Sequence, residues 1–399
     1  MQVVLFLGAG VSVPSGLPTA ASLTNRLFTD SYTDDGRGVF SPGMNATNIE
    51  AGSDVTERVR ELLEVLRTHD NEDIARVGIS PVAGGFQSSG AIYRSGSTYE
   101  DLFFLCQQIS LWNIGLSDNS LTTPFMESIE RKAGGLLRGG SLDARLCDLA
   151  SLGQQASIFI ETVVANALRR HYVVGFELIR ELATEPSIER LHIVTLNHDT
   201  LVEQYLSANG IAFVDGFGAP DGDVRWSEDG AYDTQGPHVR ILKLHGSINW
   251  YSFLFQGRAR TALLLGTDAA NARDARGLPI RSQFRRPSFL SGINKTVSYQ
   301  RGIYADVHFR FNEVLRECDQ IVMSGYGWGD SSISFQLDTW LDRNRANRII
   351  LLHQSPQELT ERSLVMASGY DAWQHAGQLI CVNRWLADVD IGEVRQHLR

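Results

Sequence analysis

Polar side chains follow two apolar runs of the sequence at the point where each run ends. Thr195, Asn197 and Asp199 follow one run, and His245 follows another. If both runs are parallel strands, these side chains lie at the carboxyl edge of the sheet, where open α/β folds bind ligands. An asparagine there can hold a water or a ribose hydroxyl, and an aspartate can accept from an amide. A histidine suits general-base work because its pKa is near neutrality.

Each of these residues also has a purely structural interpretation. Asn197 or Asp199 would cap a helix that follows the strand. His245 taken alone would be a structural histidine, although Gly246 after it favours partial exposure. The two interpretations stay open for the group.

Two glycine-containing turns accompany the polar groups. Gly8-Ala9-Gly10-Val11-Ser12 follows the apolar residues 3–7 and precedes a predicted helix, and Gly16-Leu17-Pro18 adds a constrained turn. Small residues in this context let backbone N–H groups approach a pyrophosphate. The third glycine of a dehydrogenase G-x-G-x-x-G fingerprint is absent, and a plain tight turn would explain the first two equally well.

A second glycine loop, Gly325-Tyr326-Gly327-Trp328-Gly329-Asp330, follows the apolar run Gln320–Ser324. Glycines at alternate positions allow another molecule to approach the backbone. The alternative is a bend that returns the chain to a helix at about Ser332, with both aromatic residues in the core.

The elements that must position these residues are predicted from apolar periodicity. Short apolar runs alternating with helix-like segments favour an α/β fold with a parallel sheet. The expected strands are 3–7, His192–Leu196, Ile211–Val214, Val239–Leu244, Gln320–Ser324, Arg348–Leu352 and Gln378–Val382. Helices are expected at Asp199–Ser207 and His308–Glu317, among others.

Residues 30–185 are expected to form a mainly helical elaboration of this core. The helices expected there are a segment through Val55 and Leu66, Tyr99 to about Leu111 capped by Ser97 or Thr98, and Ser157–Leu182. A further helix, Ala20–Phe28, is expected after the first glycine turn. Loops are expected at 29–53, 78–97, 115–140 and 253–300. The last carries seven arginines, which we interpret as a solvated or oligomer-facing surface rather than an anion or nucleic-acid contact.

Composition limits the class of protein. The chain has 399 residues and a net charge of −10, so nucleic-acid binding would need a local basic patch. Four scattered cysteines indicate neither a zinc ribbon nor a disulfide framework. No apolar run reaches the roughly 18 residues of a membrane helix, and the start lacks a signal pattern, so a cytoplasmic location is expected.

The ordered set of motifs resembles the SIR2 (sirtuin-like) superfamily, specifically its bacterial anti-phage defence branch of NAD-hydrolysing proteins. The resemblance rests on Gly8-Ala9-Gly10-x-Ser12, Gly16-x-Pro18, Thr195-x-Asn197-x-Asp199, His245-Gly246 and Gly325. It implies a Rossmann-like parallel sheet of the sirtuin type with a large helical insertion. It also implies one NAD-binding domain over residues 1–399.

The resemblance further implies that NAD+ is a substrate and that no metal is needed. Asn197 and His245 would be catalytic, with Asn197 positioning water or ribose and His245 acting as base or ribose partner. The residues expected to bind NAD+ are Gly8, Ala9, Gly10, Ser12, Pro18, Thr195, Asp199, Gly325 and Tyr326. Hydrolysis to nicotinamide and ADP-ribose is expected; the alternatives are ADP-ribosyl transfer and a non-catalytic nucleotide sensor.

Two departures narrow the resemblance. Deacetylase sirtuins commonly carry a four-cysteine zinc module after the His-Gly motif, where this chain has only Cys318. They also commonly have an arginine after the Gly-x-Pro turn, where Thr19-Ala20-Ala21 stands here. Acyl-lysine handling is therefore not expected. Homo-oligomerisation and a separate partner are expected, a HerA-like ATPase first and an Argonaute-type protein second.

Overall fold

A computed structural model gives the fold of the chain. It describes residues 1–34, 39–43, 53–76, 97–112, 122–137, 147–170, 172–233, 236–283, 286–290 and 299–398. These residues divide into two compact units. One contains Met1–Thr19, Leu168–Leu290 and Lys295–Arg399, and the other is built on Ala20–Ala167. The predicted strands lie in the first unit.

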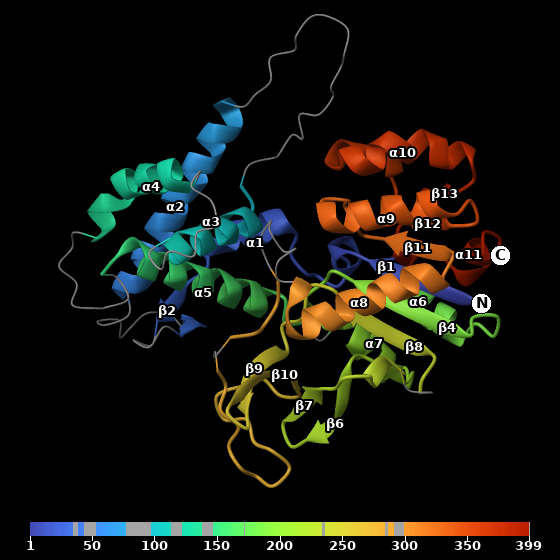
Figure 1. Cartoon of the computed structure of the whole chain (residues 1–399), viewed down its shortest axis with the longest axis horizontal. Coiled ribbons are helices and arrows are strands. Elements are labelled where there is room, and N and C mark those ends of the chain that lie inside the picture. Colours follow the sequence, from blue (N-terminus) through green and yellow to red (C-terminus); the bar gives the residue numbers. More distant parts are fainter. Residues whose placement is uncertain are drawn as a thin grey trace, which may run out of the picture. The chain divides into compact units, whose positions relative to one another are not determined.

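The first unit is built on a seven-stranded sheet in which every neighbouring pair is parallel (Figure 1). Its strand order is β13-β12-β11-β1-β4-β8-β5. The strands are β1 (Gln2–Leu7), β4 (Arg190–Thr195), β5 (Phe213–Val214), β8 (Val239–Lys243), β11 (Gln320–Ser324), β12 (Arg348–Leu352) and β13 (Leu379–Val382). The predicted α/β fold with a parallel sheet is confirmed.

Helices connect these strands and bury the sheet. They are α6 (Glu177–Thr184), α7 (Leu201–Ala208), α8 (Gly302–Glu317), α9 (Ser331–Arg343), α10 (Leu364–His375) and α11 (Ile391–Arg395). Side chains of α8, α9 and α10 share one core cluster with Val4 and Phe6 of β1. Val3 and Leu5, which alternate with them, are also fully buried. Burial on both faces explains why β1 reads as a continuous apolar run.

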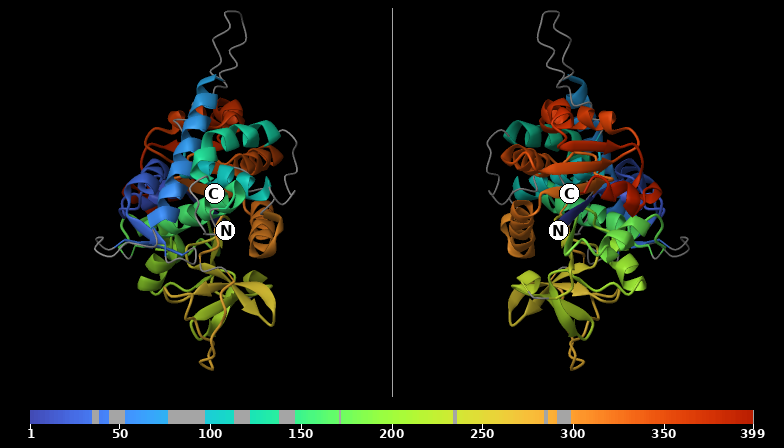
Figure 2. Two further views of the ribbon diagram at one scale, coloured as in Figure 1. Left: turned by 90° about the vertical axis from the view of Figure 1, so that its left-hand side faces the viewer. Right: turned by 90° about the vertical axis from the view of Figure 1, so that its right-hand side faces the viewer.

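A four-stranded antiparallel sheet with the order β6-β7-β10-β9 also belongs to the first unit (Figure 2). Its strands are β6 (Phe217–Asp221), β7 (Val224–Ser227), β9 (Trp250–Phe255) and β10 (Arg258–Leu264). The expectation of a loop over 253–300 is therefore wrong at its start. Gln256 and Gly257 both have positive φ, as a tight hairpin turn between β9 and β10 requires. The exposed arginines at the tip interrupt the apolar pattern from which strands are predicted.

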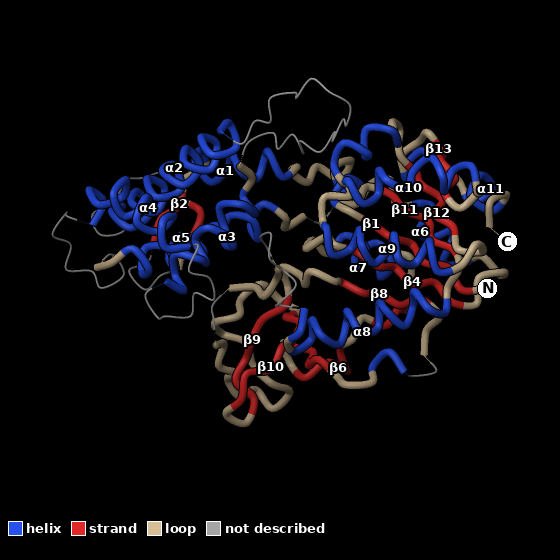
Figure 3. Tube along the Cα trace, turned by 45° about the horizontal axis from the view of Figure 1, so that its top comes forward, coloured by secondary structure: helices blue, strands red, loops and turns tan. Residues whose placement is uncertain are grey.

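The second unit is mainly helical (Figure 3). It contains α1 (Ala20–Thr29), β2 (Tyr32–Asp34), β3 (Phe40–Pro42), α2 (Ser53–Arg76), α3 (Tyr99–Trp112), α4 (Thr122–Leu137) and α5 (Leu149–Ala167). Thr98 caps α3, since its hydroxyl accepts from the Asp101 N–H while the Asp101 carboxylate accepts from the Thr98 N–H. This confirms one of the two predicted caps.

Two expectations for the helical region are wrong. The loop expected at 115–140 contains α4, whose helical pattern is weakened by its glycine pair. The single helix expected over Ser157–Leu182 is divided into α5 and α6, and Gly175 between them has a φ of +78°. The stretch 78–96 lies outside the described residues. Within those residues, no helix combines the length and apolar character needed to cross a membrane.

Candidate active site

The site is built where four neighbouring parallel strands end. β11, β1, β4 and β8 are adjacent in the sheet, so Gly325, Gly8, Asn197 and His245 follow strands whose carboxyl ends lie side by side. The chain leaves β1 toward β4 and later returns to β11 on the other side of β1. Such a reversal of strand order opens the crevice in which α/β sheets bind ligands.

The two glycine turns are joined backbone to backbone. The Gly8 N–H donates to the Ser324 carbonyl at 3.0 Å, and the Gly10 N–H donates to the Gly325 carbonyl at 3.0 Å. A Cβ at Gly8 would lie 2.5 Å from the Gly325 oxygen, and Gly325 has a φ of +68°. The contact between turns thus demands these glycines. Ala9 and Gly10 are exposed and face solvent in the first unit.

Asn197 is held by the first turn and keeps one polar atom unused. Its Nδ2 donates to the Gly8 carbonyl at 3.1 Å and to the Ser12 Oγ at 3.2 Å. Its backbone N–H donates to the Thr195 Oγ1 at 3.0 Å. Its Oδ1 is buried and has no hydrogen-bond partner among the described residues. A buried acceptor without a partner is unusual and fits a bound water or ligand hydroxyl.

Asp199 is engaged at both carboxylate oxygens. Oδ2 accepts from the Ser12 hydroxyl at 2.8 Å, and Oδ1 accepts from the Leu201 N–H at 3.0 Å at the start of α7. Asp199 thus closes a turn onto the first residue of α7, whose N-cap position is Thr200, so the predicted capping by Asp199 is not the arrangement found. The same carboxylate also fixes Ser12, and through it the amide of Asn197.

A buried ion pair supports this network. The Lys243 Nζ lies 2.9 Å from the Glu203 Oε1 and also donates to the Asp199 carbonyl. Burial raises the pKa of Glu203, and the Lys243 charge opposes that shift. Lys243 ends β8 and thereby ties the loop after β4 to the strand that carries His245. Neither residue was predicted to have a role, although a lysine that ends an apolar strand is a recognisable signal in the sequence.

His245 faces a carboxylate and a phenol. Its Nε2 lies 3.2 Å from the Asp330 Oδ2 and 3.0 Å from the Tyr299 Oη. Tyr299 donates to the same carboxylate oxygen at 3.3 Å, while the Asp330 Oδ1 accepts from the Ile333 N–H and caps α9. Both partners of His245 were missed by sequence analysis. Asp330 had a signal, because it ends the glycine loop directly before a predicted helix.

A second histidine, His308, packs against Tyr299. The His308 ring is stacked on Tyr299 with ring centroids 3.7 Å apart, and its Nε2–H donates to the Leu244 carbonyl at 3.1 Å. Burial lowers the pKa of His308 to about 4, despite opposing contributions from the Leu244 carbonyl and Asp330. His308 is therefore neutral near pH 7 and positions Tyr299 by packing.

The remaining predicted site residues differ in exposure. Thr195 is buried, and Pro18 is half-buried in its turn. Tyr326 lies in the core, where its hydroxyl donates to the Asp330 carbonyl at 2.9 Å, and Trp328 belongs to the same core cluster. The interpretation of both residues as core aromatics fits this burial.

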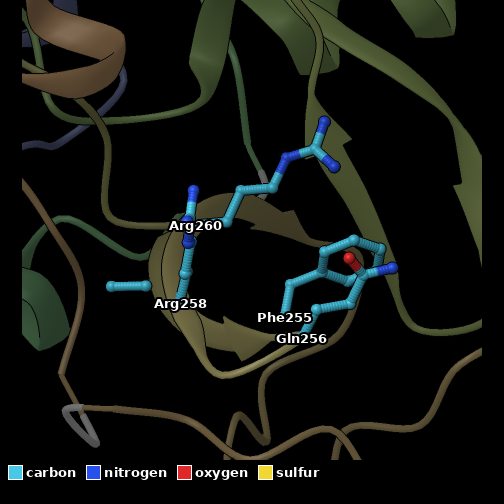
Figure 4. Close-up of a pocket in the computed structure, with 5 residues that line it drawn as sticks. Phe255, Gln256, Arg258 and Arg260 are labelled. Carbon is cyan, nitrogen blue, oxygen red and sulfur yellow. The ribbon is translucent and has the colours of Figure 1, made fainter.

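Two other kinds of site, a metal centre and a surface hollow, are not found at this edge among the described residues. Among the described residues, no group of three His, Cys, Asp or Glu side chains is arranged to hold a metal ion. A hollow of about 470 Å³ lies on the β9–β10 hairpin, lined by Phe255, Gln256, Arg258, Ala259 and Arg260 (Figure 4). None of the lining residues belongs to the sheet edge.

Comparisons with known proteins give a domain match. Residues 191–373 match the family model of the SIR2-like domain. A comparison with curated proteins finds no match. Solved structures that match include a sirtuin from work on the structural basis of sirtuin substrate affinity, at 11% identity, covering 100% of this chain and 93% of that chain with a TM-score of 0.32. Another is a Sir2 protein with a p53 peptide and NAD+, at 10% identity, 94% and 93% coverage and a TM-score of 0.30.

Proposed function

We propose that this chain, whose residues 191–373 match the SIR2-like domain, is an NAD+ glycohydrolase that releases nicotinamide and ADP-ribose. The matched segment contains Asn197, His245 and Gly325. These follow three strands that end at one edge of the sheet, together with the Gly8–Ser12 turn. A nucleotide substrate fits the exposed turn at this edge, where Asn197 and His245 are buried.

The observation that carries the proposal is the unused Oδ1 of Asn197. Its amide nitrogen is fixed by Gly8 and Ser12, so Oδ1 has a defined direction and cannot rotate away without breaking both bonds. An acceptor held in this manner can take a hydrogen bond from a ribose hydroxyl or from the attacking water. Preorganisation of this kind lowers the entropic part of the barrier.

The chemistry that the site must perform is modest. The bond between the ribose carbon and the nicotinamide nitrogen breaks, and its electron pair stays on the nitrogen, so nicotinamide leaves as a neutral molecule. Water then adds to the oxocarbenium-like ribose carbon and loses one proton. His245 is the base for that proton or the partner of a ribose hydroxyl. Asp330 stabilises the imidazolium that results, because its carboxylate lies 3.2 Å from Nε2.

The experiment that tests the reaction is a product balance. The purified chain is incubated with NAD+, and nicotinamide and ADP-ribose are quantified by chromatography and mass spectrometry. Hydrolysis predicts equal amounts of both. Nicotinamide without free ADP-ribose, together with a protein or nucleic acid that gains the ADP-ribosyl mass, would show transfer instead. NAD+ binding without turnover, alone and in its assemblies, would show a sensor.

The proposal extends to biological role on family resemblance alone. We propose that the chain depletes NAD+ in anti-phage defence, as a homo-oligomer regulated by a separately encoded partner. A HerA-like ATPase is the first candidate and an Argonaute-type protein the second. Repeating the product balance with proteins encoded beside the gene tests the dependence. Full activity of an isolated monomer contradicts it.

A further inference from the structure

The carboxyl end of β12 carries polar side chains that the proposed reaction does not use. β12 lies beside β11 in the large sheet, two strands away from β1 (Figure 1). His353 directly follows β12, and its backbone N–H donates to the Val382 carbonyl at the end of β13. The 3-10 helix Pro356–Arg362 comes next in the chain. We define the β12 edge group as His353 and Arg362.

Arg362 lies against the glycine loop that follows β11. A Cβ at Gly327 would lie 3.0 Å from the Arg362 Nη1, so the guanidinium takes the space that a side chain at position 327 would need. The φ of Gly327 is not positive, so it is this contact and not the backbone conformation that favours glycine there. The Arg362 side chain is exposed and makes no hydrogen bond or ion pair with another described residue. Its charge is therefore available to a ligand at this loop.

His353 is held as a neutral hydrogen-bond donor. Its Nδ1 accepts from the Ser355 N–H at 3.1 Å, so the hydrogen of the neutral ring is on Nε2. Burial lowers the pKa of His353, and the nearby positive charge of Arg362 lowers it further. The ring packs edge-on against Trp385 with centroids 4.6 Å apart, and the Trp385 Nε1–H donates to the Gln354 Oε1 at 3.1 Å. These contacts give the Nε2–H of His353 a fixed direction.

The place of the group in the sheet determines which part of a dinucleotide it meets. Asn197 and His245 follow β4 and β8 on one side of β1, so the nicotinamide riboside lies on that side in the proposed reaction. β11 and β12 lie on the other side of β1. Neighbouring strands are about 4.8 Å apart, so β12 is about 14 Å from β4 across three spacings. A dinucleotide that crosses the Gly8 turn therefore brings its adenosine half to the β12 edge group.

The chemistry of the group indicates a phosphate rather than a ribose hydroxyl. Dinucleotide sites that read the 2′-hydroxyl of the adenosine ribose use a carboxylate, whereas an arginine accommodates a 2′-phosphate. The residues at the end of β12 are His353, Gln354 and Ser355, and none of them is acidic. Glu358 lies on the following 3-10 helix, and its charge affects the pKa of His353 less than that of Arg362 does. Guanidinium and imidazole N–H groups both donate to phosphate oxygens, and bonds to a charged acceptor are strong.

We propose that Arg362 and His353 bind the 2′-phosphate of NADP+, so that the site cleaves NADP+ in preference to NAD+. Arg362 donates to the phosphate oxygens from the Gly327 loop, and the Nε2–H of His353 donates from the end of β12. The bond between the ribose carbon and the nicotinamide nitrogen breaks as before, so NADP+ and water give nicotinamide, ADP-ribose 2′-phosphate and one proton. The cleavage step rests on the proposed function, whereas the preference for a 2′-phosphate is measured by binding alone.

Calorimetric titration of the full chain measures the binding preference. The ligands are AMP, adenosine 2′,5′-bisphosphate and, as a probe of equal charge, adenosine 3′,5′-bisphosphate. We expect the 2′,5′-bisphosphate to bind at least about tenfold more tightly than either of the others, because it alone places a charged acceptor at Arg362. Arg362→Gln should remove most of this difference, and Arg362→Lys should keep part of it because the charge remains. Equal affinity for the 2′,5′- and 3′,5′-bisphosphates, or an undiminished difference in Arg362→Gln, overturns the proposal.

Steady-state kinetics tests the same preference in cleavage. We expect kcat/KM for nicotinamide release to be at least about tenfold greater with NADP+ than with NAD+, and Arg362→Gln to raise the KM for NADP+ more than that for NAD+. The matched control is Arg345→Gln, an exposed arginine in the turn before β12, which should change neither KM. A kcat/KM for NADP+ no greater than that for NAD+, or equal effects of the two substitutions, overturns the proposal. If neither dinucleotide is cleaved, the proposed function fails and the titration alone decides whether a 2′-phosphate is bound. Melting temperatures confirm that each variant is folded.

Discussion

Lys243 and Glu203 show how single residues hold the candidate site. Their ion pair is buried and is bonded to the Asp199 carbonyl. We expect Lys243→Met to lower the free energy of unfolding by about 3–5 kcal/mol, because it leaves the Glu203 carboxylate buried without its cation. Urea denaturation measures the change.

The matched control for the ion pair removes both charges. Lys243→Met combined with Glu203→Leu should recover most of the lost stability, because no uncompensated charge remains. If the double variant is no more stable than Lys243→Met alone, the buried pair is not the cause of the loss.

Asp330 is expected to act through His245. Asp330→Asn keeps an oxygen to cap α9 but removes the negative charge beside the imidazole Nε2. We predict that kcat for nicotinamide release falls at least about tenfold while KM changes little. Asp319→Asn, at an exposed residue directly before β11, is the control. A kcat for Asp330→Asn equal to that of the control would remove Asp330 from the mechanism.

Residue types alone reveal only part of this site. Asn197 and His245 could be found because each follows an apolar run in an order that resembles a known family. Tyr299 could not, because it lies far from His245 in sequence and no local pattern marks it. The unused Oδ1 of Asn197 is likewise a property of three-dimensional packing, since it depends on the bonds from Nδ2 to Gly8 and Ser12.

At the scale of elements, the backbone contact between the turns that follow β1 and β11 can be tested directly. Gly8→Ala would place a Cβ 2.5 Å from the Gly325 carbonyl oxygen, with backbone atoms that cannot move aside easily. We expect a loss of about 1–3 kcal/mol in unfolding free energy, typical of overpacking. Thermal or urea unfolding measures it.

Gly329→Ala is the control for the contact between the two turns, because a Cβ there meets no atom within 4 Å. It should be neutral within about 0.5 kcal/mol. Equal losses for the two variants would mean that the glycine effect is not specific to the contact between the turns.

Helices and strands could be predicted from the sequence where a single hydrophobic pattern covered the whole element. β11 and β12 have the expected bounds, because a strand buried on both faces is a short continuous apolar run between polar residues. β9 and β10 were missed because their shared tip is polar and arginine-rich. α4 was missed because paired glycines weaken a helical pattern, and tertiary packing decides such cases.

For the whole molecule, two buried histidines predict how stability depends on pH. Burial lowers the pKa of His192 to about 3 and that of His308 to about 4, whereas both titrate near 6.5 when unfolded. Below pH 6.5 the unfolded state binds protons that the folded state does not. The contribution of these two histidines to the free energy of unfolding is therefore fully present above pH 6.5. It falls toward pH 4, by at most about 1.4 kcal/mol per pH unit for each histidine.

Urea unfolding between pH 7 and pH 4.5 checks this dependence. His192→Phe should make the fall less steep, because it removes one group that gains a proton on unfolding. An unchanged slope would mean that His192 is already protonated in the folded state.

The central claim is that one edge of the large sheet binds NAD+ and cleaves it with Asn197 and His245. The most direct measurement is the rate of nicotinamide release by Asn197→Ala and His245→Ala beside the parent chain, in the assembly in which the parent is active. Far-ultraviolet circular dichroism confirms their folding. We predict that both folded variants lose nicotinamide release. Release at the parent rate by either folded variant would contradict the mechanism.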